Sequence, residues 1–128
     1  MHNIKYLAGA AIMLLATNAI ATPRQLITHN NTNVESNAYI DGVPSIYPTK
    51  AQSTGKIFWA AVKMACVGHA VNGKCSAAII MGANSSNPIT IGNLVLDLTS
   101  GDISPKTLSA NGYTVVVNAP GETTLSSD

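Results

Sequence analysis

The chain has 128 residues with seven Lys and Arg, six Asp and Glu, and a formal net charge of +1 at pH 7. A chain of this size can bury a hydrophobic core of its own, so we expect one folded domain. The low and balanced charge argues against a nucleic-acid-binding surface, which needs clustered Lys and Arg, and predicts no electrostatic attraction to anionic membranes.

Residues 1–21 have the pattern of a secretory signal peptide. A short start containing Lys5 precedes an apolar run from about Tyr6 to Ala16, and Ala19 and Ala21 form a small-x-small cleavage pattern. The alternative, a membrane anchor, is less favoured because the apolar run is about half of the roughly 20 residues that cross a bilayer. We expect cleavage near Ala21, export to the periplasm or the outside, and no integral membrane segment in the mature chain.

Cleavage would remove Lys5 alone among the charged residues, which leaves six basic side chains against six acidic ones. Solubility would then depend on Ser, Thr and Asn, and a surface of this kind resists self-association poorly. Self-association is therefore one expectation for the mature chain.

Residues 22–52 are rich in Asn and Thr and contain the turn-favouring Asp41-Gly42 pair, Pro44 and Pro48. We interpret this segment as an extended N-terminal arm, with short strands near residues 25–29 and 37–40. A disordered leader is the alternative interpretation. Residues 53–128 would form the folded body.

The body begins with apolar residues at every second position from Phe58 to Cys66, a period that indicates a strand. Helix is an alternative for this segment, because Trp59 and Val62 also lie at helical spacing. Residues 75–82 form a short apolar run that is consistent with a buried strand. Residues 89–98 place three leucines on one face, as in a strand with one buried and one wet side.

A short helical turn is expected near residues 105–110. Ser104 can cap it, Pro105 suits the first helical position, and Asn111-Gly112 can end it. Strands follow near residues 113–117 and 123–125. The whole pattern predicts an all-β fold: a small single-domain β-sandwich, or a partly open barrel, with about five to seven short antiparallel strands.

Cys66 and Cys75 are the two cysteines of the chain, and in an exported protein two cysteines usually pair. Between them, Asn72-Gly73 is a strong signal for a tight hairpin. If both cysteines lay on the strands of that hairpin, their Cα atoms would be roughly 13 Å apart, whereas a disulfide needs about 7 Å or less. We therefore expect the disulfide and the tight hairpin to exclude each other unless a bulge intervenes, and we favour the disulfide.

Cys66, His69 and Cys75 could instead supply three ligands for zinc or copper. Their spacing matches no paired C-x2-C or H-x3-H arrangement. In an oxidising compartment the two thiols would form a disulfide instead of binding a metal. The expectation is therefore that the chain binds no metal and needs no cofactor.

No sequence motif of a hydrolase, metalloprotease or phosphate-binding loop is present. His29 and His69 could be combined with a serine and with Asp41, Asp97 or Asp102, but no spacing supports a triad. We therefore do not expect an enzyme.

The favoured function is a secreted binding protein whose disulfide-closed loop presents His69, Asn72 and Lys74 to a protein or glycan partner, because a loop fixed beforehand loses less entropy on binding. The first alternative is a structural or assembly subunit whose N-terminal arm adds as a strand to a neighbouring sheet. A small exported enzyme is the less favoured second alternative.

Overall fold

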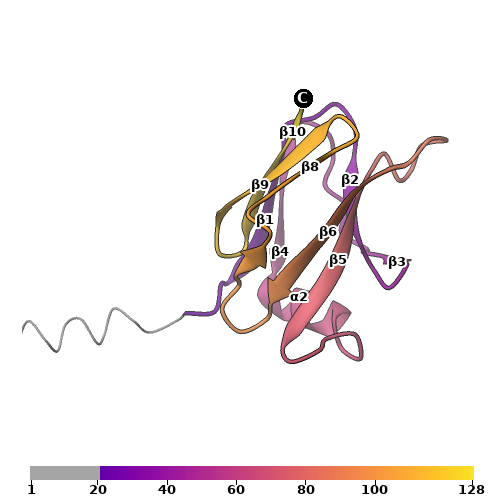
Figure 1. The fold of residues 1–128 in the computed structure, drawn as a ribbon. Coiled ribbons are helices and arrows are strands. Elements are labelled where there is room, and N and C mark those ends of the chain that lie inside the picture. The colour runs from indigo at the N-terminus through magenta and orange to yellow at the C-terminus, as the bar shows by residue number, and fades with distance from the viewer. Residues whose placement is uncertain (1–20) are drawn as a thin grey trace, which may run out of the picture.

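The structure is a computed structural model that describes residues 21–128, and within this range it forms a β-sandwich of two five-stranded sheets (Figure 1). The all-β sandwich expected from the sequence is confirmed. The described residues contain ten strands, two of them only two residues long, against the five to seven expected. The expected signal peptide lies outside the described residues, apart from its last residue, Ala21.

The first sheet has the strand order β4-β1-β10-β9-β8, and the second has the order β3-β2-β5-β6-β7. All strand pairs are antiparallel except β1 and β10, which run parallel. In chain order the elements are β1 (Gln25–Asn30), β2 (Ser36–Ile40), β3 (Val43–Pro44), β4 (Ser53–Phe58), helix α2 (Trp59–Ala65), β5 (Lys74–Met81), β6 (Ile89–Asp97), β7 (Ile103–Ser104), β8 (Thr107–Ala110), β9 (Tyr113–Ala119) and β10 (Glu122–Ser127).

The N-terminal segment is part of the sandwich. Strands near residues 25–29 and 37–40 are confirmed, as β1 and β2. The description of residues 22–52 as an arm outside the body is wrong, because β1 pairs with β4 on one side and with β10 on the other. A strand whose backbone groups are paired on both sides is not free to add to the sheet of a neighbouring molecule.

Residues 59–65 form helix α2, so the favoured strand interpretation of this segment is wrong and the helical alternative is correct. Trp59 and Val62, three positions apart, are buried, whereas Met64 is exposed. The indole Nε1 of Trp59 donates a hydrogen bond to the carbonyl oxygen of Leu98 at 2.9 Å. Burial at helical spacing, together with this bond, fixes the helix against the loop that follows β6.

The helical turn expected near residues 105–110 is also wrong. Residues 107–110 form strand β8, and Asn111-Gly112 is the two-residue turn that joins β8 to β9. Both turn residues have positive φ, 54° and 91°, the geometry for which Asn-Gly is favoured in tight hairpins. Asn111-Gly112 is therefore a hairpin turn and not the end of a helix.

The hydrophobic core lies between the two sheets and includes one side of α2. Its buried members are Trp59, Val62, Met81, Ile91, Leu94, Leu96, Ile103, Val115 and Leu125. The alternation predicted for residues 89–98 is confirmed, because Leu94 and Leu96 face this core. In the part of the chain that the structure covers, no helix has the length and apolar character needed to span a membrane.

Candidate binding site

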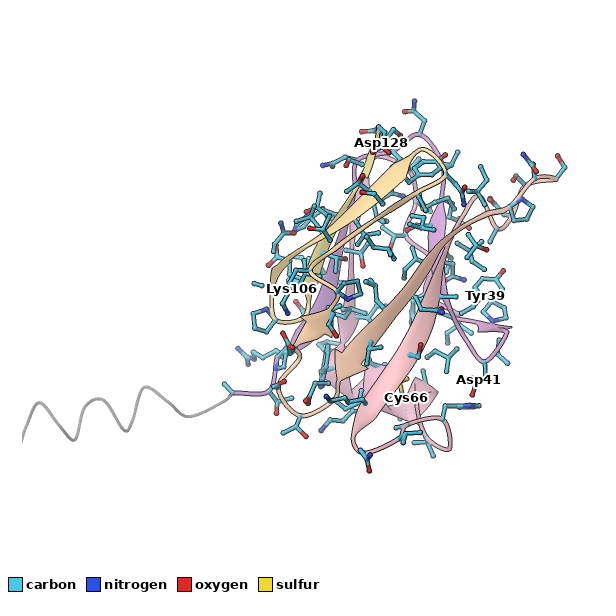
Figure 2. The ribbon with its side chains drawn as sticks, in the orientation of Figure 1. Tyr39, Asp41, Cys66, Lys106 and Asp128 are labelled. Atoms are coloured by element: carbon cyan, nitrogen blue, oxygen red, sulfur yellow. A yellow bond between two sulfur atoms is a disulfide. The ribbon has the colours of Figure 1, made fainter. Side chains whose placement is uncertain are left out.

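The disulfide between Cys66 and Cys75 is present, and it ties the end of α2 to the second residue of β5. The two Cα atoms are 6.0 Å apart, and both side chains are buried. Because both sulfur atoms are used in this bond, the alternative set of metal ligands Cys66, His69 and Cys75 is not available. Figure 2 shows Cys66 at the same end of the sandwich as Asp41 and far from Asp128.

A tight Asn72-Gly73 hairpin coexists with the disulfide, so the expectation that each excludes the other is wrong. Val71 and Lys74 exchange two backbone hydrogen bonds of 2.9 and 3.0 Å around this turn. The distance argument fails because Cys66 is not on a strand of the hairpin. It follows the helix, and residues 67–70 lead the chain from there back to the hairpin.

The three loop residues expected to form one binding surface lie in different places. His69 Nδ1 contacts the carboxylate of Asp41, in the turn between β2 and β3. Asn72 is in the exposed hairpin turn, and Lys74 lies opposite Asp97 of β6. Only His69 borders the cavity described next.

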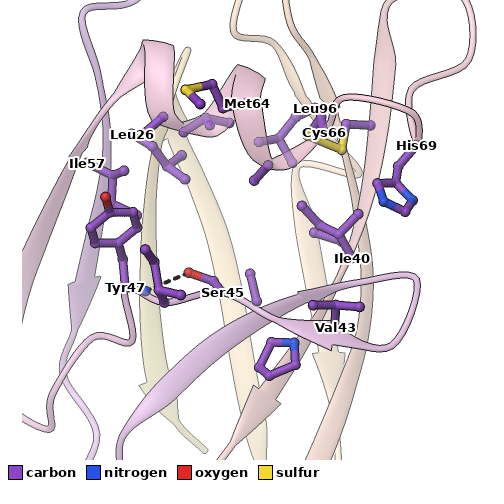
Figure 3. A pocket seen from close by; sticks show the side chains of 18 residues that line it. Leu26, Ile40, Val43, Ser45, Tyr47, Ile57, Met64, Cys66, His69 and Leu96 are labelled. Carbon is purple, nitrogen blue, oxygen red and sulfur yellow. Dashed lines mark hydrogen bonds between the residues drawn. A yellow bond between two sulfur atoms is a disulfide. The ribbon is translucent and has the colours of Figure 1, made fainter.

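An apolar cavity of about 450 Å³ opens between the two sheets, below α2 and beside the β2–β3 hairpin (Figure 3). Its inner wall includes the buried side chains of Val62, Ala77 and Leu96. Four large apolar side chains at its mouth are exposed: Val43 by 62%, Ile46 by 81%, Tyr47 by 50% and Met64 by 75%. This volume is within the range of roughly 300–1,000 Å³ for small-molecule pockets.

Two of the polar side chains on the cavity wall, Ser45 and His69, have partners within the protein. The hydroxyl of Ser45 accepts a hydrogen bond from the backbone N–H of Tyr47 at 2.9 Å. The imidazole of His69 contacts Asp41. The cavity therefore offers a hydrophobic surface and few free hydrogen-bonding groups.

The outer side of the same end of the molecule also exposes large apolar residues. Met64 of α2 and Val67 of the loop are each 75% exposed, and Val71 is 70% exposed. We call Met64, Val67 and Val71 the loop surface. The strand predicted for this segment does not reveal the loop surface, because a strand with that alternation would place Met64 in the core.

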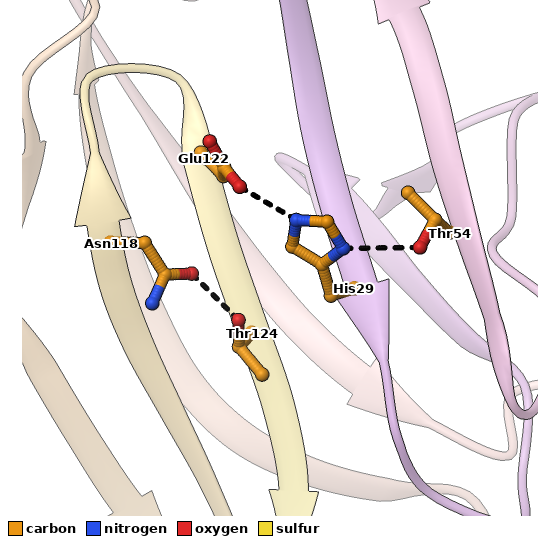
Figure 4. A network of polar contacts seen from close by, with 5 residues as sticks. All are labelled: His29, Thr54, Asn118, Glu122 and Thr124. Carbon is orange, nitrogen blue, oxygen red and sulfur yellow. Dashed lines mark hydrogen bonds and ion pairs between the residues drawn. The ribbon is translucent and has the colours of Figure 1, made fainter.

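A separate polar network lies across four strands of the first sheet (Figure 4). His29 Nε2 is 2.6 Å from Glu122 Oε2, and His29 Nδ1 is 3.0 Å from the hydroxyl of Thr54. Next to it, the hydroxyl of Thr124 donates to Asn118 Oδ1 at 2.6 Å. A carboxylate, an imidazole and a hydroxyl are thus aligned, but none of His29, Glu122 and Thr54 borders either described pocket.

The serine-containing triads considered from the sequence are not assembled. Among the described residues, neither His29 nor His69 has a hydrogen bond to a serine hydroxyl. His69 does contact Asp41, one of the acids considered. Asp97 has another role, described below.

The family of this chain follows from comparison with known proteins. All 128 residues match the family described as T2SS substrate NttC. The chain belongs to the NttC family. The crystal structure of the Legionella pneumophila type II secretion system substrate NttC is 51% identical in sequence and superimposes with a TM-score of 0.82, covering 83% of this chain and 99% of that chain. No curated protein sequence matched this chain.

Membership in the NttC family of secretion substrates indicates an exported protein, and the shared fold agrees with the small β-sandwich. The disulfide fits an oxidising compartment outside the cytoplasm. The descriptions of the family and of its solved member name no ligand.

Asp97 of the NttC-family chain stabilises the turn after β6. Its Oδ1 accepts hydrogen bonds from the backbone N–H groups of Ser100, at 3.0 Å, and Thr99, at 2.9 Å. These bonds, with a smaller contribution from the charge of Lys74, hold the pKa of Asp97 below its usual value. Asp102 pairs with Lys106. Both carboxylates thus have structural partners at the surface.

Proposed function

We propose that this NttC-family chain is an exported, non-catalytic binding protein that leaves the cell by type II secretion and binds a protein partner through its loop surface. The observation that carries this proposal is the exposure of Met64, Val67 and Val71, each at least 70% accessible, within eight residues of chain. Several large apolar side chains exposed in one short segment of a soluble protein are a candidate interaction site. The description of the family supports the type II route.

The chemistry of the loop surface favours a protein over a glycan. Glycans present hydroxyl groups, which need polar partners and are often stacked on aromatic rings. The one tryptophan, Trp59, is in the core, and the loop surface is aliphatic. Aliphatic side chains of this kind pair with the hydrophobic centre of a protein interface.

The loop is held in place before any partner arrives. The Cys66–Cys75 disulfide fixes its two ends, the Asn72-Gly73 turn closes its far side, and the contact of His69 with Asp41 joins it to the β2–β3 turn. A surface that is already ordered loses less conformational entropy on binding. This arrangement supports recognition by the loop.

A non-catalytic role is supported by the surroundings of the two histidines. His29 contacts Glu122 and Thr54 on the outer face of a sheet, outside the described pockets. A catalytic group needs a place where a reacting atom can lie close to it. The His29 network supports cross-strand pairing in the first sheet.

Site-specific photo-crosslinking tests this proposal. A benzophenone amino acid placed at Val67 should give a discrete crosslink to the protein partner. The same amino acid at Val116, on the outer face of β9 and 38% exposed, is the matched control. Equal crosslinking from both positions, or capture of glycan alone on an array, would contradict the proposal.

A further inference from the structure

We infer that the cavity between the two sheets binds one aliphatic acyl chain, as carried by a free fatty acid. This activity goes beyond the proposed protein binding, because it uses the inside of the sandwich and shares only Met64 with the loop surface. Neither Val67 nor Val71 borders the cavity.

Small side chains on the cavity wall leave the space that the acyl chain would fill. Ala38, Ala61, Ala65 and Ala77 line the cavity from β2, α2 and β5. The larger side chains around them, including Leu26, Ile57 and Leu96, give a wall of hydrocarbon. Water gains few hydrogen bonds in such a space, so an apolar ligand that displaces it binds favourably.

The small number of free polar groups on the wall favours an acyl chain over a peptide as the ligand. A peptide brings backbone N–H and C=O groups, which lose hydrogen bonds to water and need new partners when they are buried. Among the polar side chains at the cavity, Ser45 and His69 already have partners within the protein. A chain of methylene groups needs no such partners.

The size and the mouth of the cavity favour one chain with its head group in water. About 450 Å³ is in the lower half of the usual range of roughly 300–1,000 Å³ for small-molecule pockets, so a single chain fits better than the paired chains of a membrane lipid. The exposed side chains of Ile46, Tyr47 and Met64 extend the apolar wall to the surface. Figure 3 shows Met64 and Tyr47 on one side of this space, and Ile40 and Val43 on the other.

A calorimetric titration with octanoate, decanoate and dodecanoate below their aggregation concentrations tests the inference. Each added methylene that enters the cavity should tighten binding by about fourfold, until the cavity is full. Binding that does not depend on chain length would indicate adsorption to the surface and would overturn the inference.

Two neighbouring alanines of α2 provide a matched pair of variants. Ala61 is partly buried and lines the cavity, whereas Ala60 is exposed and does not line it. Ala61→Leu should weaken dodecanoate binding at least tenfold, and Ala60→Leu should leave it unchanged. Thermal unfolding of both variants checks that each is folded, and Ala38→Leu fills the cavity from β2 if Ala61→Leu does not fold.

The same variants distinguish a free fatty acid from a membrane. If phosphatidylglycerol vesicles retain the protein while dodecanoate does not bind, or if Ala61→Leu binds dodecanoate like the original chain, the inference is wrong. Replacement of Val67 and Val71 by Ser should leave dodecanoate binding unchanged, so failure of the acyl-chain site and failure of the protein-binding surface can be recognised separately.

Discussion

Cys66 and Cys75 join the end of the only helix in residues 21–128 to a central strand of the second sheet, with their Cα atoms 6.0 Å apart. Because α2 continues directly from β4 at the edge of the first sheet, the disulfide links the two sheets at the end where the cavity opens. The loop between the cysteines carries the exposed Val67 and Val71.

Removal of this disulfide should destabilise the fold without abolishing it. Closing a loop of about ten residues contributes roughly 2.5–3 kcal/mol by restricting the unfolded chain. The double variant Cys66→Ala/Cys75→Ala should lose about that free energy of unfolding in urea titrations. A loss below about 1 kcal/mol would contradict this contribution of the disulfide to stability.

Asn30 should be among the least replaceable polar residues. Its side chain is fully buried and donates to the carbonyl oxygens of Val34, Thr49 and Lys50, at 2.9, 3.2 and 3.2 Å. Asn30→Asp would place a carboxylate oxygen against these carbonyls, which should cost about 2–4 kcal/mol of unfolding free energy. The neighbouring Asn31 is exposed, so Asn31→Asp is the matched control and should change stability by less than about 0.5 kcal/mol. Equal effects in denaturant titrations would refute the role of Asn30.

Trp59 and Phe58 form a second matched pair. Trp59 is 3% exposed and donates to Leu98, whereas Phe58 is 72% exposed. Trp59→Phe leaves the carbonyl of Leu98 without this donor and leaves a gap in the core, so it should cost about 2–3 kcal/mol. Phe58→Leu should be nearly neutral, and thermal unfolding of both variants compares them. A larger loss from Phe58→Leu would mean that Phe58 is the residue that anchors the helix.

The acid stability of the protein should depend on Asp97. Because hydrogen bonds from Ser100 and Thr99 lower its pKa in the folded state, its contribution to stability is present above the unfolded value of about 3.9 and is lost as the pH falls through the lower folded value. Urea midpoints measured from pH 7 down to pH 2.5 should therefore fall less steeply below about pH 4 for Asp97→Asn than for the original chain. Parallel curves for the two proteins would contradict this assignment.

The β-sandwich can be predicted from the sequence because strands with one buried face show an alternation of apolar and polar residues within a short segment. Leu94 and Leu96 alternate with polar neighbours in a strand with one buried face, and such a pattern needs no knowledge of distant partners. The pairing of Cys66 with Cys75 is predictable because the chain has two cysteines and is expected to be exported.

The sequence pattern gave wrong predictions at two places where the same residues are compatible with two kinds of secondary structure. Asn72-Gly73 and Asn111-Gly112 form the same kind of turn. Asn111-Gly112 is also compatible with the end of a helix, and the preceding Ser104 and Pro105 resemble the start of one. Residues 59–65 are apolar at both helical and strand spacing, and the burial of Trp59 against the loop after β6 decides between them.

The cavity could not be predicted from the sequence, because residues far apart in the chain form it. Leu26, Ala38, Ala61 and Leu96 come from β1, β2, α2 and β6. Each is an ordinary apolar residue in its own segment. Only the pairing of β1 in the first sheet and β2 in the second brings them around one space.

The most direct test of the central claim is the dissociation constant between the purified chain and the protein that crosslinks to Val67. Val67→Ser/Val71→Ser should weaken this binding at least tenfold, while Val116→Ser on the outer face of β9 should leave it within about twofold. Equal affinity of the original chain and both variants would show that the loop surface does not bind the partner.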